Sequence, residues 1–192
     1  MHLALRLHPD SLCLAATRID VDVARSPAGS LLLTYIVIGK IGDLRLPPVT
    51  AAARTDGLWR HTCFEAFVRP LPGEAYYEFN FAPSTQWAAY RFDRYRSGMR
   101  VATEIGAPWI GVQAAPERYA LQAALDLSRL PRDAPWRLGL AAVIEERAAV
   151  YPIGRWRIRP ASRTSIIPIA LRVKFLKRSG DEIWHRSTDR RS

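Results

Sequence analysis

The sequence predicts an all-β protein built as an antiparallel two-sheet β-sandwich, of the immunoglobulin-like or jelly-roll kind. Three observations lead to this fold class. Short runs of alternating apolar and polar residues recur along the chain, Pro- and Gly-containing turn signals separate them at near-even spacing, and no long amphipathic helical pattern appears before Tyr151. Strands of this kind, about eight here, bury their apolar faces against a second sheet.

The first predicted elements are an edge segment and a hairpin. Residues 1–14 have mixed character and are expected to form a lead-in that pairs at a sheet edge. Residues 17–24 alternate apolar with charged side chains, residues 31–38 are rich in β-branched and aromatic residues, and a Ser-Pro-Ala-Gly-Ser turn joins the two runs. A loop over residues 44–57 then leads to the next block.

Residues 59–93 are the stretch around which the rest of the chain is organised. They predict three successive strands, with a Pro/Gly turn over residues 70–74 between the first two. A period of two gives each strand an aromatic side, which is expected to face the core. The opposite side of the three strands is expected to carry Glu65, Glu78, Asn80 and Arg91.

The second half of the chain continues the β pattern. Residues 94–99 predict a loop, and residues 109–112 and 118–125 predict another hairpin. One short helical turn is expected over residues 126–131, because Pro131 would end it. Residues 136–146 alternate apolar with other residues and predict a strong strand.

The composition favours a cytoplasmic protein without a membrane partner. Two cysteines, Cys13 and Cys63, suit the reduced thiols of the cytosol. Charged residues and a proline interrupt the first sixteen residues, so the apolar centre of a signal peptide is missing. No apolar run approaches the length of a membrane span.

The positive charge of the chain belongs to its last part. Residues 152–192 hold eleven Lys and Arg against three Asp and Glu, a net charge of +8, whereas residues 1–151 have seventeen against fifteen, a net of +2. The predicted organisation is therefore a sandwich over residues 1–151 followed by a basic tail over residues 152–192.

The most specific pattern is Trp59-x5-Glu65-x-Phe67, then a short turn, then Tyr76-Tyr-Glu-Phe-Asn80 with Pro83. This block, with the strand at residues 136–146, resembles the DOMON-like proteins, which are relatives of the family 9 carbohydrate-binding modules. The resemblance extends over roughly residues 11–146. It implies a β-sandwich that holds a sugar or a haem in a cleft at one face, and it implies binding rather than catalysis.

The resemblance also implies a set of site residues. In the sugar-binding relatives, a Trp at the position of Trp59 stacks on a pyranose ring and a Glu at the position of Glu65 hydrogen-bonds hydroxyls. We expect Asn80 and Arg91 to add hydrogen bonds from the same face, since charged groups and amides bind hydroxyls well. At His61 the chain departs from relatives that carry acidic residues there, so no metal site is carried over.

The tail departs from the family in a particular way. DOMON-like proteins of this type end with a segment close to WALxHPPGKPDFHH and a last strand. Residues 153–171 can be encoded by codons that, read two bases on, spell WPLAHPPGKPDFHHPDCF. We therefore hypothesise a reading-frame change between about residues 143 and 153, and we expect a non-native or poorly ordered tail. Residues 166–176 are apolar enough to pair with the strand edge left open, although Pro168 limits that pairing.

Three other functions compete with saccharide binding. A haem would need axial ligands, for which Met99 and His61 are the candidates. Nucleic acid could bind the basic tail, where Trp156 and Trp184 lie among arginines. An enzyme is not expected, because the sequence shows no nucleophile elbow, phosphate-cradling Gly loop or metal-ligand spacing. The oligomeric state is left open.

Overall fold

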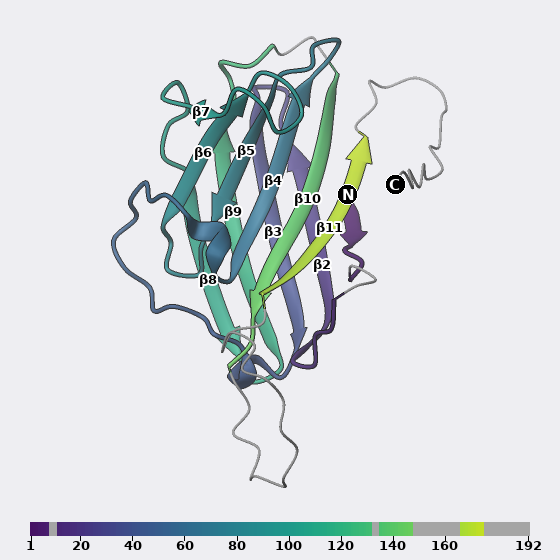
Figure 1. Ribbon diagram of the computed structural model, residues 1–192, viewed down its shortest axis with the longest axis vertical. Coiled ribbons are helices and arrows are strands. Elements are labelled where there is room, and N and C mark those ends of the chain that lie inside the picture. Colours follow the sequence, from purple (N-terminus) through teal and green to yellow (C-terminus); the bar gives the residue numbers. More distant parts are fainter. Residues whose placement is uncertain (8–10, 132–134, 148–165, 175–192) are drawn as a thin grey trace, which may run out of the picture.

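The computed structural model describes residues 1–7, 11–131 and 135–147, and residues 166–174 by their backbone. Two antiparallel sheets pack face to face, so the predicted β-sandwich is confirmed (Figure 1). The described residues form eleven strands and two short 3₁₀ helices. No helix in the described part is long and apolar enough to cross a membrane.

The five-stranded sheet contains the first hairpin and the later one. Its strands, in spatial order, are β1 (His2–Ala4), β2 (Ala16–Arg25), β3 (Ser30–Gly39), β9 (Arg118–Asp126) and β8 (Trp109–Ala115). The alternation predicted for β2 holds, because Ile19, Val21 and Val23 are buried in the core. The lead-in also pairs as expected, since β1 forms the edge next to β2.

The six-stranded sheet contains the block that carries the predicted site. Its strands, in spatial order, are β11 (Ile166–Lys174), β10 (Trp136–Glu145), β4 (Cys63–Pro70), β5 (Tyr76–Phe81), β6 (Trp87–Phe92) and β7 (Arg100–Val101). In Figure 1 this sheet lies in front of the five-stranded one. The 3₁₀ helices are η1 (Ile41–Asp43) and η2 (Leu58–Arg60), and η2 packs on β4 and β5.

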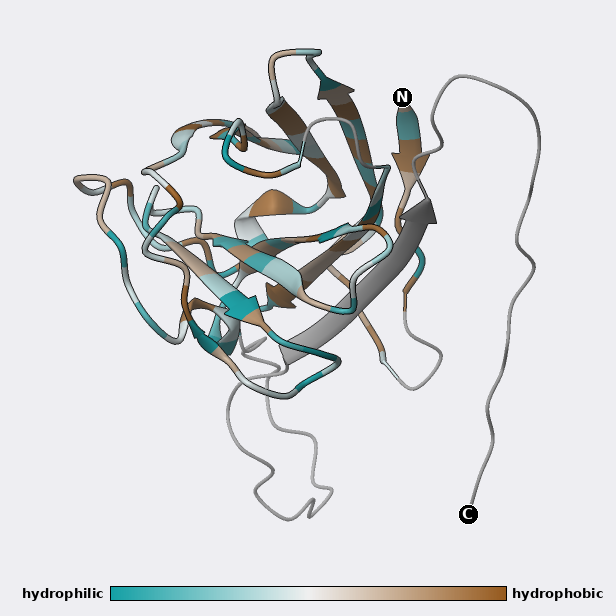
Figure 2. Cartoon of the chain, turned by 90° about the horizontal axis from the view of Figure 1, so that it is seen from above, coloured by the Kyte–Doolittle hydropathy of each residue, from teal (hydrophilic) through white to brown (hydrophobic). Residues whose placement is uncertain are grey.

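The core lies between the sheets and includes a direct polar link from one sheet to the other. Tyr35 of β3 is fully buried, and its ring lies 5.1 Å from that of Phe64 in β4. The Tyr35 hydroxyl donates a hydrogen bond of 2.7 Å to the backbone carbonyl of Glu65. This bond holds the backbone of β4, from the core side of the sheet, at the predicted site residue Glu65. Brown and teal segments alternate along several strands in Figure 2, as strands with one buried face require.

Some local predictions were wrong. The segment after β9 has no helix; the Leu130 amide donates a hydrogen bond of 2.9 Å to the Leu127 carbonyl, which closes a simple turn. The strand predicted at residues 109–112 runs on to Ala115, because its pairing with β9 continues. The short strand β7 and the two 3₁₀ helices were not predicted, since segments this short carry no periodic pattern.

Strand β11 lies within the range predicted to be a basic tail. It pairs with β10 from Arg137 to Glu145, so the edge of β10 is covered by backbone hydrogen bonding along its length. Pro168 lies opposite Val143 within that ladder. The rest of residues 152–192 lies outside the described residues, and the predicted reading-frame change stays a hypothesis.

Candidate functional site

A loop tied to the rim of the sandwich brings Trp59 to the outer face of the six-stranded sheet. Arg54 donates hydrogen bonds to the carbonyls of Ala89, Ala102 and Ile105, at 3.1–3.2 Å, which holds the loop against β6. Gly57 then turns the chain into η2 with a φ of +75°, a value that favours glycine.

Trp59 packs on the sheet through a tyrosine. The rings of Trp59 and Tyr90 meet edge to face, with their centroids 5.7 Å apart. The Tyr90 hydroxyl donates to Asp56 in the loop at 2.7 Å, so the same tyrosine also holds the approach to η2. Trp59 is only partly buried, in contrast to Tyr90. The tryptophan therefore rests on the sheet and keeps part of its ring exposed to solvent.

Two glutamates lie near one another on this face. Glu65 of β4 pairs in register with Asn80 of β5, and Glu78 of β5 pairs with Phe67 of β4. Residues paired in this way project from the same face of a sheet. The predicted placement of Glu65, Glu78 and Asn80 on one face is thus confirmed.

Burial and mutual repulsion change the acidity of these carboxyl groups. Desolvation and, secondarily, the charge of Glu78 raise the pKa of Glu65 from 4.5 to about 7. Desolvation also raises the pKa of Glu78, against a hydrogen bond from Asn80 and the charge of Arg96, which lower it. No hydrogen bond to the Glu65 side chain is formed by the described residues. That carboxyl group is therefore left to interact with solvent or with a ligand.

Asn80 is buried beside the two carboxyl groups, and both ends of its side-chain amide form hydrogen bonds. Its side-chain nitrogen donates to Glu78 at 3.1 Å, and its side-chain oxygen accepts from the Cys63 thiol at 3.5 Å. Asn80 and Cys63 are fully buried. Burial raises the pKa of the Cys63 thiol well above its usual value, so this cysteine is a protonated donor and not a nucleophile.

The predicted place of Arg91 on this face is wrong. Arg91 pairs in register with Tyr77, and its neighbours two residues away on β6, Ala89 and Trp87, belong to the core between the sheets. Its guanidinium lies 3.9 Å from a carboxylate oxygen of Glu104 and near the Tyr77 ring. The physical reason is that both sides of β6 carry aromatic residues, so the aromatic side did not identify the core side.

Aromatic residues take the place that Arg91 was expected to fill. The outer side of β6 carries Ala88, Tyr90 and Phe92, which pack with the η2 residue Leu58 in a second apolar cluster. Phe92 stacks on Tyr76 of β5 with their ring centroids 4.7 Å apart. Sequence reasoning missed the contact between Tyr90 and Asp56, because it joins a strand and a loop that are 34 positions apart in the sequence.

The candidate haem ligands are engaged or lie elsewhere on the surface. His61 Nδ1 lies 2.9 Å from Glu145, a fully buried carboxylate that Arg45 also contacts at 2.8 Å. Met99 is 56% exposed in the connection between β6 and β7. Among the described residues, no group of three or more His, Cys, Asp or Glu side chains is arranged to hold a metal ion. Trp156 and Trp184 lie outside the described residues.

The arrangement can bind a polar ligand that has one apolar face. The exposed part of Trp59 offers a flat apolar surface, and Glu65 offers an acceptor or, when protonated, a donor. Such a combination suits a molecule with many hydroxyl groups on a small ring.

Comparisons with known proteins identify the fold. No protein-family model matches the chain, and no curated protein matches it. A solved structure with a similar fold is that of a putative carbohydrate-binding protein from Bacteroides uniformis ATCC 8492, with a TM-score of 0.58 and 13% sequence identity. The alignment covers 94% of this chain and 80% of that chain. At this identity the similarity establishes a shared β-sandwich fold.

Proposed function

We propose that this protein is a non-catalytic binding module for a saccharide or a similar small polar ligand. The binding surface would be the outer face of the six-stranded sheet, with Trp59 stacking on the sugar ring. The proposal rests mainly on the Glu65 carboxyl group. No described residue forms a hydrogen bond with it, and burial raises its pKa to about 7. A partly buried carboxyl group without a protein partner can form its hydrogen bonds with solvent, or with ligand hydroxyl groups that replace that solvent.

The remaining polar groups would set the orientation of the ligand. Glu78 is held by Asn80 at 3.1 Å and would present its other oxygen to a hydroxyl group. Asn80 itself is fully buried, so we assign it a positioning role beneath Glu65 and Glu78 and not a direct contact. Arg91 has no part in this proposal, because it lies on the other face of the sheet.

Two further considerations support a saccharide. The solved structure with a similar fold is described as that of a putative carbohydrate-binding protein. The block from Trp59 to Asn80 resembles the sugar-binding relatives of DOMON-like proteins, and we include that kinship in the proposal. Haem has weaker support, because His61 is already paired with Glu145.

Isothermal titration calorimetry tests the proposal with the full chain and with Trp59→Ala. The titrants are glucose, galactose, xylose, mannose and their disaccharides. We expect at least one of them to bind the wild type and to lose about tenfold or more in affinity with Trp59→Ala, since a stacked aromatic contributes on the order of 1 kcal/mol beyond its buried area. Equal affinity in the two proteins would refute the role of Trp59.

A further inference from the structure

The outer face of the five-stranded sheet, opposite to the site above, carries an exposed tryptophan whose ring packs against the sheet. Trp109 begins β8 and is 59% exposed. A Cβ atom added to Gly111 would lie 2.6 Å from Cη2 of the Trp109 ring, and 3.0 and 3.3 Å from the adjacent ring atoms Cζ2 and Cζ3. The six-membered ring therefore lies over Gly111, and any larger residue at this position would push it away.

The strand register places hydrogen-bonding groups beside this ring. Gly111 pairs with Gln122 of β9, and Gln122 pairs with Thr34 of β3. These three positions form a row across the sheet, and the Trp109 ring lies at one end of it. Gln122 is exposed, and the described residues form no hydrogen bond with its side chain. An amide donor and acceptor are thus free next to an apolar ring.

A second exposed apolar side chain lies in the neighbouring row. Trp109 pairs with Ala124 of β9, which pairs in turn with Leu32 of β3, and Leu32 is 42% exposed. Adjacent strands are about 4.8 Å apart, so Leu32 and Trp109 are separated by about 10 Å across the small Ala124. The surface thus offers two apolar contacts with amide and hydroxyl groups alongside.

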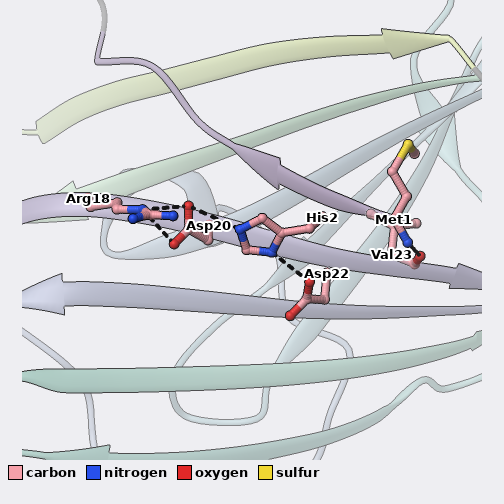
Figure 3. A network of polar contacts seen from close by, with 6 residues as sticks. All are labelled: Met1, His2, Arg18, Asp20, Asp22 and Val23. Atoms are coloured by element: carbon pink, nitrogen blue, oxygen red, sulfur yellow. Dashed lines mark hydrogen bonds and ion pairs between the residues drawn. The ribbon is translucent and has the colours of Figure 1, made fainter.

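The two carboxyl groups at the β1–β2 side of this face each contact another side chain of the protein. His2 Nδ1 lies 2.8 Å from Asp22, and Arg18 Nε lies 2.7 Å from Asp20 (Figure 3). Asp22 pairs in register with Thr34 and so continues the row that starts at Gly111. Because Asp22 already contacts His2, the uncharged positions Gly111, Gln122 and Thr34 are the part of the row that suits a neutral molecule with many hydroxyl groups.

A second copy of the chain fits this surface less well. Stable dimers bury about 800 Å² on each partner around an apolar centre. Of the exposed large apolar side chains in the described residues, only Leu32 and Trp109 belong to β2, β3, β8 or β9. Two such side chains are too few for an interface of that size.

We propose that Trp109, Leu32, Gln122 and Thr34 form a second saccharide-binding surface, which takes a segment of a neutral polysaccharide. Trp109 stacks on one sugar ring, and Gln122 and Thr34 hydrogen-bond its hydroxyls. Leu32 contacts a ring further along the polysaccharide. The surface is on the opposite sheet from Trp59, so this proposal stands or falls independently of the first site.

Native gel electrophoresis of the full chain in gels that contain mixed-linkage β-glucan, glucomannan, xylan or galactomannan tests this proposal. We expect at least one polysaccharide to retard the wild type, and we expect Trp109→Ala to reduce the apparent affinity about tenfold. Gly111→Ala keeps the tryptophan but displaces its ring, so it should weaken retardation as well. Tyr95→Ala removes another exposed aromatic, 67% exposed in a loop, and should leave retardation unchanged.

Each other outcome has a definite meaning. Retardation that survives both Trp109→Ala and Gly111→Ala, or no retardation by any of the four polysaccharides, refutes the second surface. Sedimentation that shows a dimer for the wild type and a monomer for Trp109→Ala refutes it in favour of self-association. Trp59→Ala keeps the retardation if the two surfaces are independent, and thermal unfolding of each variant shows that the fold is intact.

Discussion

Glu65 and Asn80 lie directly opposite each other on β4 and β5, yet the Asn80 amide donates to Glu78, at 3.1 Å, and not to Glu65. The Cys63 thiol donates a hydrogen bond to the oxygen of the same Asn80 amide. Glu65 is therefore the member of this polar group that the described residues leave without a hydrogen bond. Glu65 is only partly buried, so its free carboxyl oxygens can form hydrogen bonds with a ligand at the outer face of the sheet.

Replacement of Glu65 should change how stability depends on pH. The folded state keeps the Glu65 proton up to about pH 7, whereas the unfolded chain loses it near its ordinary pKa of 4.5. The folded state binds more protons in this window, so stability falls as pH rises from about 4.5 to about 7. Glu65→Gln removes this effect and should stabilise the protein at pH 8 by on the order of 3 kcal/mol.

Urea unfolding of the wild type and Glu65→Gln at pH 5 and pH 8 measures this difference. Glu74→Gln is the matched control, because Glu74 is exposed and has no bonded partner among the described residues. A pH profile of Glu65→Gln parallel to that of the wild type would show that Glu65 has an ordinary pKa.

Saccharide affinity should rise with pH around neutrality if Glu65 accepts a hydrogen bond from the ligand. Its ionised form accepts stronger hydrogen bonds than its protonated form, and its pKa of about 7 places the change in an accessible range. Titrations at pH 6 and pH 8 with the sugar that binds best should show tighter binding at pH 8. Affinity that stays constant between these values would mean that Glu65 does not contact the ligand as an acceptor.

Arg54 should stabilise the loop that carries Trp59. Its guanidinium donates to three backbone carbonyls and lies over the Trp87 ring, with 4.2 Å to the ring centroid. Arg54→Met should lower the free energy of unfolding by about 2 kcal/mol, since hydrogen bonds from a charged donor are among the stronger ones. Arg54→Lys should recover little, because an ammonium group cannot reach three carbonyls in a fork.

Thermal unfolding of the two Arg54 variants measures this cost. Lys40→Met, at an exposed residue, serves as the control for loss of one charge. Unfolding temperatures equal to that of the control would show that the three hydrogen bonds contribute nothing to stability.

Glu145 should be a stabilising residue and not a ligand-binding one. Its carboxylate is 1% exposed and receives Arg45 and His61 at 2.8 and 2.9 Å. In Glu145→Gln, one of these two side chains faces an amide nitrogen in place of a carboxylate oxygen. The free energy of unfolding should therefore fall by about 2 kcal/mol. The measurement is urea unfolding at pH 8 together with sugar titration, in which affinity should stay the same. A loss of affinity in a folded variant would place Glu145 in the site.

The strands could be predicted from sequence because their alternation reflects one buried face. Ile19, Val21 and Val23 lie in the core as their spacing indicates. The same reasoning failed for β6, where Trp87 and Ala89 face inward and Tyr90 and Phe92 face outward. Both sides of that strand are apolar, so only its register with β5 decides which side is buried, and register is a tertiary property.

The candidate site could be predicted in part. Trp59, Glu65 and Asn80 stand out from the pattern, and the structure places all three on or beneath the outer face of the six-stranded sheet. The bond between Tyr90 and Asp56, which holds the approach to Trp59, joins residues from separate elements. His61 and Glu145 are 84 positions apart, so no local sequence pattern predicts their contact either. Such long-range pairs follow from the packing of elements that are distant in the sequence and not from local sequence.

The most direct test of the saccharide proposal is chemical-shift mapping by nuclear magnetic resonance on the ¹⁵N-labelled full chain with the titrants named above. The proposal predicts that a binding sugar shifts the Trp59 indole signal and the backbone amides of Glu65, Phe67 and Glu78. It also predicts that these changes vanish in Trp59→Ala. No shift with any titrant, or shifts confined to residues away from the outer face of the six-stranded sheet, would contradict the proposal.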